Sequence, residues 1–298
     1  MKIVDAHHHI WNPWTNPHPW LKPGAEIAFR YGGYEALKRP FLWADYDRLA
    51  DGLQIVASVT MEGEWAPDDP LGEAHWLQGI AVSEGRPAAH AAQAWLDRDD
   101  CADVLGALKK ISLVRSVRHK PRANIAPGGP PGGMADAAFA AGFRALAQHH
   151  LMFELQTPWW HLAEACQLAE TAPEVPIILN HTGLPADRSP DGLTAWRQAM
   201  IEFSKVPLAF VKISGLGLAG GGWDAVTNRQ IIRQTIEIFG PDRCMFASNY
   251  PVDGLCVSFV ELWHSFADAT ADLGQSERDA LFHGTATSVY GLAWEDAP

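Results

Sequence analysis

Val-Asp-Ala-His-His-His-Ile-Trp, residues 4–11, closes the first strand that the sequence predicts. Alternation along a strand would place Asp5, His7 and His9 on one face, and Ala6 and His8 on the other. Two imidazoles one strand repeat apart can converge on one metal ion or on one anionic oxygen. In a parallel barrel both rings would lie at the catalytic mouth, because the active sites of such barrels form at the C-terminal ends of the strands.

Strand-like and helix-like runs alternate along the chain. The expected strands are Lys2–Ala6, Ile55–Met61, Ala88–Ala94, Leu113–His119, Leu151–Gln156, Pro176–Asn180, Leu208–Ile213 and Arg243–Ala247. Amphipathic periodicity favours helices over Leu71–Ser83, Cys101–Lys109, Ala135–His149, Trp160–Glu170, Leu193–Ser204, Asp224–Phe239, Gly254–Ala269 and a tail from Gln275. Strand then helix, repeated eight times, predicts an α/β fold with a single TIM-type (β/α)8 barrel over residues 1–298. A doubly wound open sheet is the alternative, but no Gly-x-Gly-x-x-Gly motif follows the first strand.

Composition narrows the class of protein. The chain has 298 residues, 47% of them hydrophobic, which supports one large buried core. No run approaches the roughly 20 apolar residues of a membrane span. A net charge of −12 argues against nucleic acid or an anionic membrane as partner. The cysteines are scattered, without the paired spacing of zinc or redox sites, so we expect reduced thiols in a cytoplasmic protein.

The first connection, residues 11–40, is long and rich in proline, glycine and aromatic residues. Loops of this length in a compact domain are usually functional or disordered. The aromatic content favours an ordered lid over the mouth of the barrel, with Trp20 as a candidate contact to a ligand.

Polar residues gather where the predicted strands end, which is where a barrel carries its chemistry. His181 is the strongest single candidate, because it follows the wholly apolar Ile177-Ile178-Leu179. The full set is His7, His9, Glu62, Glu64, Arg118, His119, Lys120, Glu154, Gln156, Asn180, His181, Lys212, Ser214, Ser248, Asn249 and Tyr250.

Several motifs extend from the first strand to the last. They are Val4-Asp5-Ala6-His7-x-His9-x-Trp11 with Pro19-Trp20-Leu21, Asn180-His181-Thr-Gly-Leu-Pro, Val211-Lys212-Ile-Ser214-Gly215-Leu216, Met245-Phe246-Ala-Ser248-Asn249-Tyr250-Pro251-Val252, and Glu62-Gly-Glu64-Trp65-Ala-Pro-Asp with Glu73-Ala-His-Trp76-Leu77. Together they resemble the amidohydrolase superfamily. Within it they are similar to the amidohydrolase-2 branch, which holds sugar lactonases such as L-fuconolactonase, and pyrone-dicarboxylate lactonase.

The resemblance implies that His7, His9 and His181 line the reaction centre, with Asn249 beside them. In metal-using relatives the His-x-His pair helps to hold a divalent ion, so Zn²⁺ or another divalent metal on His7, His9 and His181, with Glu62 as a fourth ligand, stays open. Several lactonases of this branch work without a metal, and we expect none to be required here. Relatives commonly carry Asp where this chain has Asn249, and Asn cannot act as a general base at neutral pH.

The resemblance thus predicts a hydrolase that opens the lactone ring of a sugar acid or a related small carboxylated lactone. His181 or His9 could accept the proton of the attacking water, and Asp253 is nearby in sequence. Arg118, with Lys120 or Arg30 as weaker candidates, could bind a substrate carboxylate through its guanidinium fork. The other residues expected to contact the substrate are Glu154, Gln156, Lys212, Ser214, Trp20 and Tyr250.

Three other functions stay open at this point. Attack by a hydroxyl of the substrate itself would make the protein a lactone isomerase, which suits Asn249 because an intramolecular attack needs only a weak base. A metal-dependent decarboxylase is known elsewhere in the branch, although it normally depends on an Asp. A non-catalytic binder of sugar acids is the third. The expected partner is a small molecule, and a homo-oligomer is not excluded.

Overall fold

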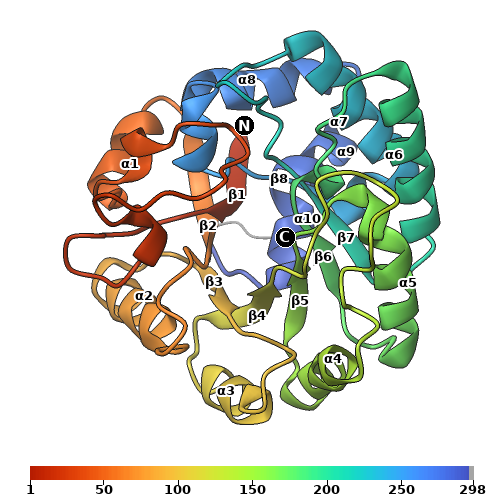
Figure 1. The fold of residues 1–298 in the computed structure, drawn as a ribbon. Helices are drawn as coiled ribbons and strands as arrows, with labels where there is room; N and C mark the ends of the chain where they lie inside the picture. Colours follow the sequence, from red (N-terminus) through yellow and green to blue (C-terminus); the bar gives the residue numbers. More distant parts are fainter. Residues whose placement is uncertain (295–298) are drawn as a thin grey trace.

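The computed structural model describes residues 1–294, and it confirms the barrel predicted from the sequence (Figure 1). Eight parallel strands pair in chain order within one sheet. They are β1 (Lys2–His8), β2 (Gln54–Met61), β3 (Ala89–Gln93), β4 (Val114–His119), β5 (Met152–Leu155), β6 (Ile177–Leu179), β7 (Ala209–Ile213) and β8 (Cys244–Phe246).

Helices surround the strands, as Figure 1 shows in a view along the barrel. They are α1 (Trp43–Leu49), α2 (Gly72–Glu84), α3 (Cys101–Leu108), α4 (Ala137–His149), α5 (Leu162–Thr171), α6 (Pro190–Phe203), α7 (Ala225–Phe239), α8 (Phe259–Ala269), α9 (Gln275–Asp279) and α10 (Thr285–Tyr290). The sequence does not predict α1, because this single short segment follows directly on the long first connection. Helix α8 begins later than expected, because Ser258 caps it by accepting a hydrogen bond from the Glu261 N–H. Among residues 1–294 there is no helix with the length and apolar character that crossing a membrane requires.

Apolar residues form two layers, one inside the barrel and one between strands and helices. The inner layer contains Val4, Ala6 and Met245 from the strands, together with Ala286 and Tyr290 from α10. The α10 segment closes the end of the barrel where the strands begin, since Arg115, at the start of β4, donates a hydrogen bond to the Tyr290 carbonyl at 3.2 Å. The opposite end, where the strands finish, is left for the site.

Strand β1 closes the barrel against β8 and is irregular at its end. The Asn249 N–H donates to the His7 carbonyl and the His9 N–H to the Tyr250 carbonyl, each at 2.7 Å. Pairing with β2 shifts register between Asp5 and His8. The expected alternation of faces is therefore wrong in part. Asp5 and His8 both contact Tyr46 of α1 on the outside, whereas Ala6 packs inside the barrel.

The first connection is an ordered segment that returns on itself. An antiparallel bridge joins Trp11 to Phe41 across its base. Inside the segment, the ring of Trp20 lies 5.5 Å from that of Trp11 and stacks on Phe29 at 5.9 Å. The Trp20 indole also donates to the Gly63 carbonyl at 2.8 Å, which ties the segment to the loop after β2.

Candidate active site

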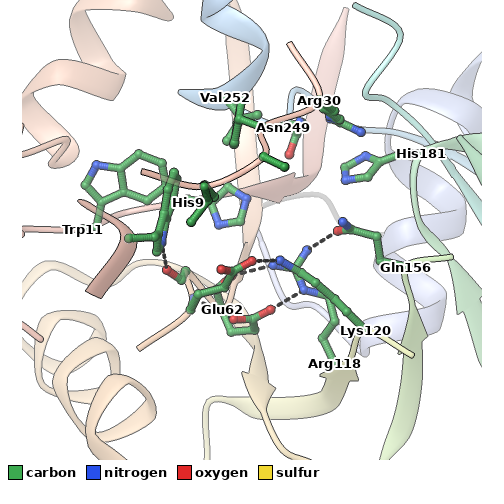
Figure 2. Close-up of a pocket in the computed structure, with 16 residues that line it drawn as sticks. His9, Trp11, Arg30, Glu62, Arg118, Lys120, Gln156, His181, Asn249 and Val252 are labelled. Atoms are coloured by element: carbon green, nitrogen blue, oxygen red, sulfur yellow. Dashed lines mark hydrogen bonds and ion pairs between the residues drawn. The ribbon is translucent and has the colours of Figure 1, made fainter. Parts of the chain in front are cut away.

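A cavity of about 260 Å³ lies at the C-terminal ends of the strands, beneath the first connection (Figure 2). Asn249, Arg30 and His181 lie next to one another along one side of it, and Glu62, Arg118 and Lys120 lie along the opposite side. Residues Ile27, Ala28 and Phe29 of the first connection also line it. The predicted site residues in its wall are His9, Trp20, Arg30, Glu62, Glu64, Arg118, Lys120, Gln156, His181 and Asn249.

Three imidazole rings meet at this cavity. The ring centroid of His7 lies 5.2 Å from that of His9 and 4.8 Å from that of His181. His9 and His181 line the cavity, whereas His7 is buried beneath them and is not part of the wall. Among the described residues, neither ring nitrogen of His7 has a hydrogen-bond partner. The structure thus brings the three predicted histidines together, with His7 behind the other two.

Hydrogen bonds orient the two histidines in the wall. His9 Nδ1 lies 3.1 Å from the Met61 carbonyl oxygen, which can only accept, so the neutral ring carries its hydrogen on Nδ1 and a lone pair on Nε2. His181 Nδ1 lies 2.9 Å from Ser214 Oγ, a hydroxyl that can donate to it. Ser214 therefore orients His181 and does not line the cavity, contrary to its expected role in binding substrate.

The electrostatic surroundings keep both rings neutral. Burial lowers the pKa of His9 well below its ordinary value of 6.5, and the Arg118 guanidinium lowers that pKa further. Burial and the Arg30 guanidinium have the same effect on the pKa of His181. At neutral pH the cavity thus contains two uncharged imidazoles, of which His9 offers an unprotonated nitrogen.

The backbone around His181 is unusual and explains how its ring is aimed. His181 and Thr182 have φ values of 55° and 52° inside a short turn after β6. This left-handed region is rare for residues other than glycine. The ring packs on Gly215, whose φ is +65° and where a Cβ would lie 2.7 Å from His181 Nδ1. A glycine after β7 is therefore required for the ring to occupy this position.

Arg118 forms hydrogen bonds with other residues of the protein. Its Nε donates to Glu62 Oε1 at 2.5 Å, its Nη2 to the Glu62 carbonyl at 2.7 Å, and its Nη1 to Gln156 Oε1 at 3.1 Å. Burial raises the pKa of Glu62, but Arg118 and Lys120 outweigh it and hold that pKa at about 2. These bonds use three of the five N–H groups of Arg118, so a substrate carboxylate could bind only the second N–H of each Nη atom, and the fork is less available than the sequence suggested.

Arg30 is a second cation in the wall with donors to spare. Among the described residues, its buried Nη1 has no hydrogen-bond partner. Its Nη2 lies 3.5 Å from Asp253 Oδ1, a long contact. Lys120, by contrast, pairs with the Glu64 carboxylate across the mouth. Arg30 is therefore the side chain best placed to meet an anionic oxygen of a ligand.

Asn249 is oriented by Asp253. Its Nδ2 donates to Asp253 Oδ1 at 2.7 Å, so its Oδ1 is left to face the cavity. Asp253 also accepts from the Tyr31 hydroxyl at 2.8 Å and from the Gly215 N–H at 2.9 Å. Burial raises the pKa of Asp253. Both of its oxygens accept hydrogen bonds and it does not line the cavity, so the structure places Asp253 behind Asn249.

Glu154 and Lys212 form a fully buried ion pair inside the barrel, outside the wall of the cavity. Lys212 Nζ lies 2.9 and 3.0 Å from the two Glu154 oxygens. Ser116, Asn180 and the Tyr290 hydroxyl also donate to Glu154. Burial lowers the pKa of Lys212 to about 8, with Glu154 opposing the shift. Neither residue lines the cavity, so their direct contact with substrate stays a prediction from the sequence.

Tyr250 is placed away from the site as well. Its ring packs on Phe259 at 4.9 Å, and its hydroxyl donates to the Val257 carbonyl. Tyr250 does not line the cavity, and its contact to substrate stays a prediction from the sequence. Sequence reasoning also missed Tyr290, because nothing in a C-terminal helix indicates that its side chain enters the barrel.

The residues present do not fit a resident metal ion. Within residues 1–294 there is no group of three or more His, Cys, Asp or Glu side chains arranged to hold one. Glu62 is paired with Arg118, and residue 249 is an amide and not a carboxylate. The remaining donors are imidazoles, and Lys212 and Arg118 add positive charge near His7. This donor set gives no basis for routing a chemical step through a metal.

Comparison with known proteins gives a consistent set of relatives. Residues 4–292 match the family described as amidohydrolase. An uncharacterized protein, y4mH, of Sinorhizobium fredii is 34% identical over 294 residues, with 97% of this chain and 98% of that protein covered. L-fucono-1,5-lactonase of Burkholderia multivorans is 26% identical, with 97% of this chain and 96% of that enzyme covered.

A similar fold is found among solved structures. The crystal structure of an amidohydrolase from Burkholderia multivorans with bound zinc superposes with a TM-score of 0.82 at 24% identity, covering 98% of this chain and all of that one. At this level of identity the match shows the shared fold alone.

Proposed function

This chain belongs to the amidohydrolase family, and from that premise we propose that it opens the lactone ring of a sugar acid or a related small carboxylated lactone. The observation that carries the proposal is the fixed tautomer of His9, whose unprotonated Nε2 belongs to a cavity that also contains Arg30 and the amide of Asn249. The relative named L-fucono-1,5-lactonase, which matches almost the full length of the chain, supports the same reaction class.

In the proposed reaction a water molecule attacks the acyl carbon of the lactone. Asn249 Oδ1 accepts one hydrogen of this water and orients it, and His9 Nε2 takes the other as the bond to carbon forms. The carbonyl oxygen becomes an oxyanion, which is stabilised by the Arg30 guanidinium and by His181 Nε2–H when Ser214 donates to Nδ1. The bond from the acyl carbon to the ring oxygen then breaks, and His9 returns its proton to the leaving alkoxide.

The charges in the wall favour an anionic substrate. Arg30, Arg118 and Lys120 face Glu62 and Glu64, which leaves a net positive charge among the ionised side chains of the wall, since His9 and His181 are neutral. A cationic cavity raises the local concentration of an anion even in an acidic protein. This surface suits a carboxylate, whether the lactone carries one or the reaction forms one as the ring opens.

Lactone isomerisation is the second candidate, and the amide at position 249 favours it. Asn249 cannot remove a proton from water, but its oxygen can align a hydroxyl of the substrate for attack on the acyl carbon. Such an attack is intramolecular, so orientation lowers the barrier and a weak base such as His9 suffices. Decarboxylation finds no support, because it would depend on a set of metal ligands that the described residues do not form.

The test is proton NMR of the purified, chelator-treated protein with a panel of aldonolactones and aldarolactones. Ring-opened acid formed faster than in a protein-free control supports hydrolysis, and a rearranged lactone without net hydrolysis identifies an isomerase. His9→Gln serves as the matched variant and should lose the reaction. Ligand-induced melting shifts without turnover of any lactone would contradict both candidates and indicate a binder.

A further inference from the structure

A second cavity, of about 390 Å³, lies beside the catalytic one over the ends of β2, β3 and β4. Five residues belong to the walls of both cavities, so the two are neighbours that share a partition: Trp20, Glu62, Glu64, Arg118 and Lys120. We call the second cavity the side chamber. Nothing in the proposed reaction uses it.

The partition contains an ion pair that can open. Lys120 Nζ contacts Glu64 Oε1, and the two side chains are 34% and 45% exposed. An ion pair with this exposure is screened by solvent and holds its two long side chains weakly. Glu64 has a φ of 59°, and its N–H donates to Glu62 Oε2 at 2.7 Å, so the backbone beneath the pair is held in place. The side chains can therefore swing apart while the turn stays fixed.

Aromatic rings held in position line the side chamber. The Trp65 indole donates to Asp69 Oδ2 at 3.0 Å, and Gln93 Nε2 donates to the Trp65 carbonyl at 2.9 Å. The Arg98 guanidinium lies over the Trp95 ring at 4.9 Å and is itself bound to Asp100. Rings that are already ordered lose little conformational freedom when a ligand stacks on them.

Polar groups belong to the wall of the side chamber as well. The Leu96 N–H donates to His119 Nδ1 at 3.1 Å, so the neutral ring of His119 carries its hydrogen on Nε2. Burial lowers the pKa of His119, which keeps this donor uncharged. Gln93 retains its amide oxygen as an acceptor, because its bond to Trp65 uses only Nε2. Flat apolar faces with a donor and an acceptor in the same wall suit a sugar ring, which has apolar C–H faces and hydroxyl edges.

We propose that the side chamber binds a second sugar ring attached to the lactone, so that the preferred substrate is an aldobionolactone, an aldonolactone with a glycosyl substituent. This proposal rests on the proposed function, which assigns the lactone ring to the catalytic cavity, and it adds that the lactone carries a glycosyl substituent. The lactone occupies the catalytic cavity, the glycosidic link passes between Glu64 and Lys120, and the second ring stacks on Trp65 and Trp95.

Two measurements test the proposal. The first is kcat/KM for an aldobionolactone and for the unsubstituted aldonolactone, in the wild type, in Trp95→Ala, and in Trp14→Ala as a matched control at an exposed tryptophan outside both cavities. Trp95→Ala should lower the kcat/KM for the aldobionolactone, relative to that for the aldonolactone, by about tenfold, because it removes one aromatic contact to the second ring. Trp14→Ala should leave this ratio unchanged.

The second measurement is calorimetric binding of the ring-opened acids, aldobionate and aldonate, which needs no turnover. Tighter binding of the aldobionate that is lost in Trp95→Ala supports the side chamber, even if no lactone is converted and the proposed function fails. Equal binding of the two acids, or an equal effect of Trp95→Ala on both, overturns the side chamber while lactone turnover stands. Preference for an aryl-substituted acid over the aldobionate overturns the assignment to a sugar.

Discussion

Replacing Asn249 by Asp should destabilise the protein in a pH-dependent way. Asn249 Nδ2 lies 2.7 Å from Asp253 Oδ1, so the substitution sets two buried carboxylates against each other. Two unit charges about 4 Å apart repel by about 4 kcal/mol at an effective dielectric constant near 20. The two carboxylates can avoid the repulsion if one of them stays protonated. Keeping this proton costs about 1.4 kcal/mol for each pH unit above the ordinary Asp pKa near 4, so the cost at pH 7 is also about 4 kcal/mol. Burial has already raised the pKa of Asp253, so we expect a loss of about 3 kcal/mol.

The sign of the pH dependence follows from the proton that the pair retains. The folded variant binds more protons than the unfolded chain, so its deficit relative to the wild type grows as the pH rises and shrinks as it falls. We expect the deficit to fall by about 1.4 kcal/mol for each pH unit between pH 7 and pH 5. Urea unfolding followed by tryptophan fluorescence at several pH values measures it.

The exchanged double variant, Asn249→Asp with Asp253→Asn, is the control. The amide that it carries at position 253 can donate from Nδ2 to the carboxylate at position 249. The oxygen of the same amide can accept from the Gly215 N–H, in place of the present bond. The double variant should recover more than half of the lost stability and most of the pH dependence. A loss below about 0.5 kcal/mol in the single variant, a loss independent of pH, or no recovery in the double variant would refute the reasoning.

Four other changes to the site or its conditions have defined outcomes. His181→Ala should lower kcat/KM by about 10²–10³-fold with a circular dichroism spectrum near that of the wild type, and near-full activity would exclude the proposed centre. Glu154→Gln should cost about 3 kcal/mol in urea unfolding, because it removes the carboxylate that pairs with the buried Lys212, and a loss within error would contradict that role. Treatment with EDTA should leave kcat/KM within about twofold, whereas a loss of about tenfold or more that Zn²⁺ reverses would show that a metal is required. Because burial lowers the pKa of His9, kcat/KM should stay level as the pH falls below 6.5, and a half-maximal value at pH 6.5 would contradict the assignment.

Much of the fold could be predicted from the sequence because each strand of a parallel barrel is an apolar run bounded by helical periodicity. The run Ile177–Leu179 is an example: its residues are fully buried, and the polar turn that follows contains His181. The alternation rule failed at β1, because a shift in pairing with β2 lies between Asp5 and His8. Such a shift depends on the neighbouring strand and leaves no mark in the sequence of β1 alone.

The site was predicted only in part, because a residue's position near the end of a strand does not tell whether its side chain reaches the cavity or stays buried inside the barrel. Gln156, beyond the end of β5, lines the cavity, whereas Glu154 within the same strand is buried and does not. The sequence also does not show which hydrogen bonds within the protein occupy a side chain that could otherwise bind substrate. Arg118 is the case in point, since its partner Glu62 is 56 positions away.

The insertion of Tyr290 into the barrel has a consequence for how the chain folds as it is synthesised. The hydroxyl of Tyr290 donates to Glu154, which is 136 positions earlier in the chain, so all eight strands are synthesised before this bond can form. Until α10 has been added, Glu154 lacks one of its donors, and the inner apolar layer lacks a wall at the end where the strands begin. The nascent barrel therefore has a period in which its charged interior is open to water, and the docking of α10 is the event that seals it.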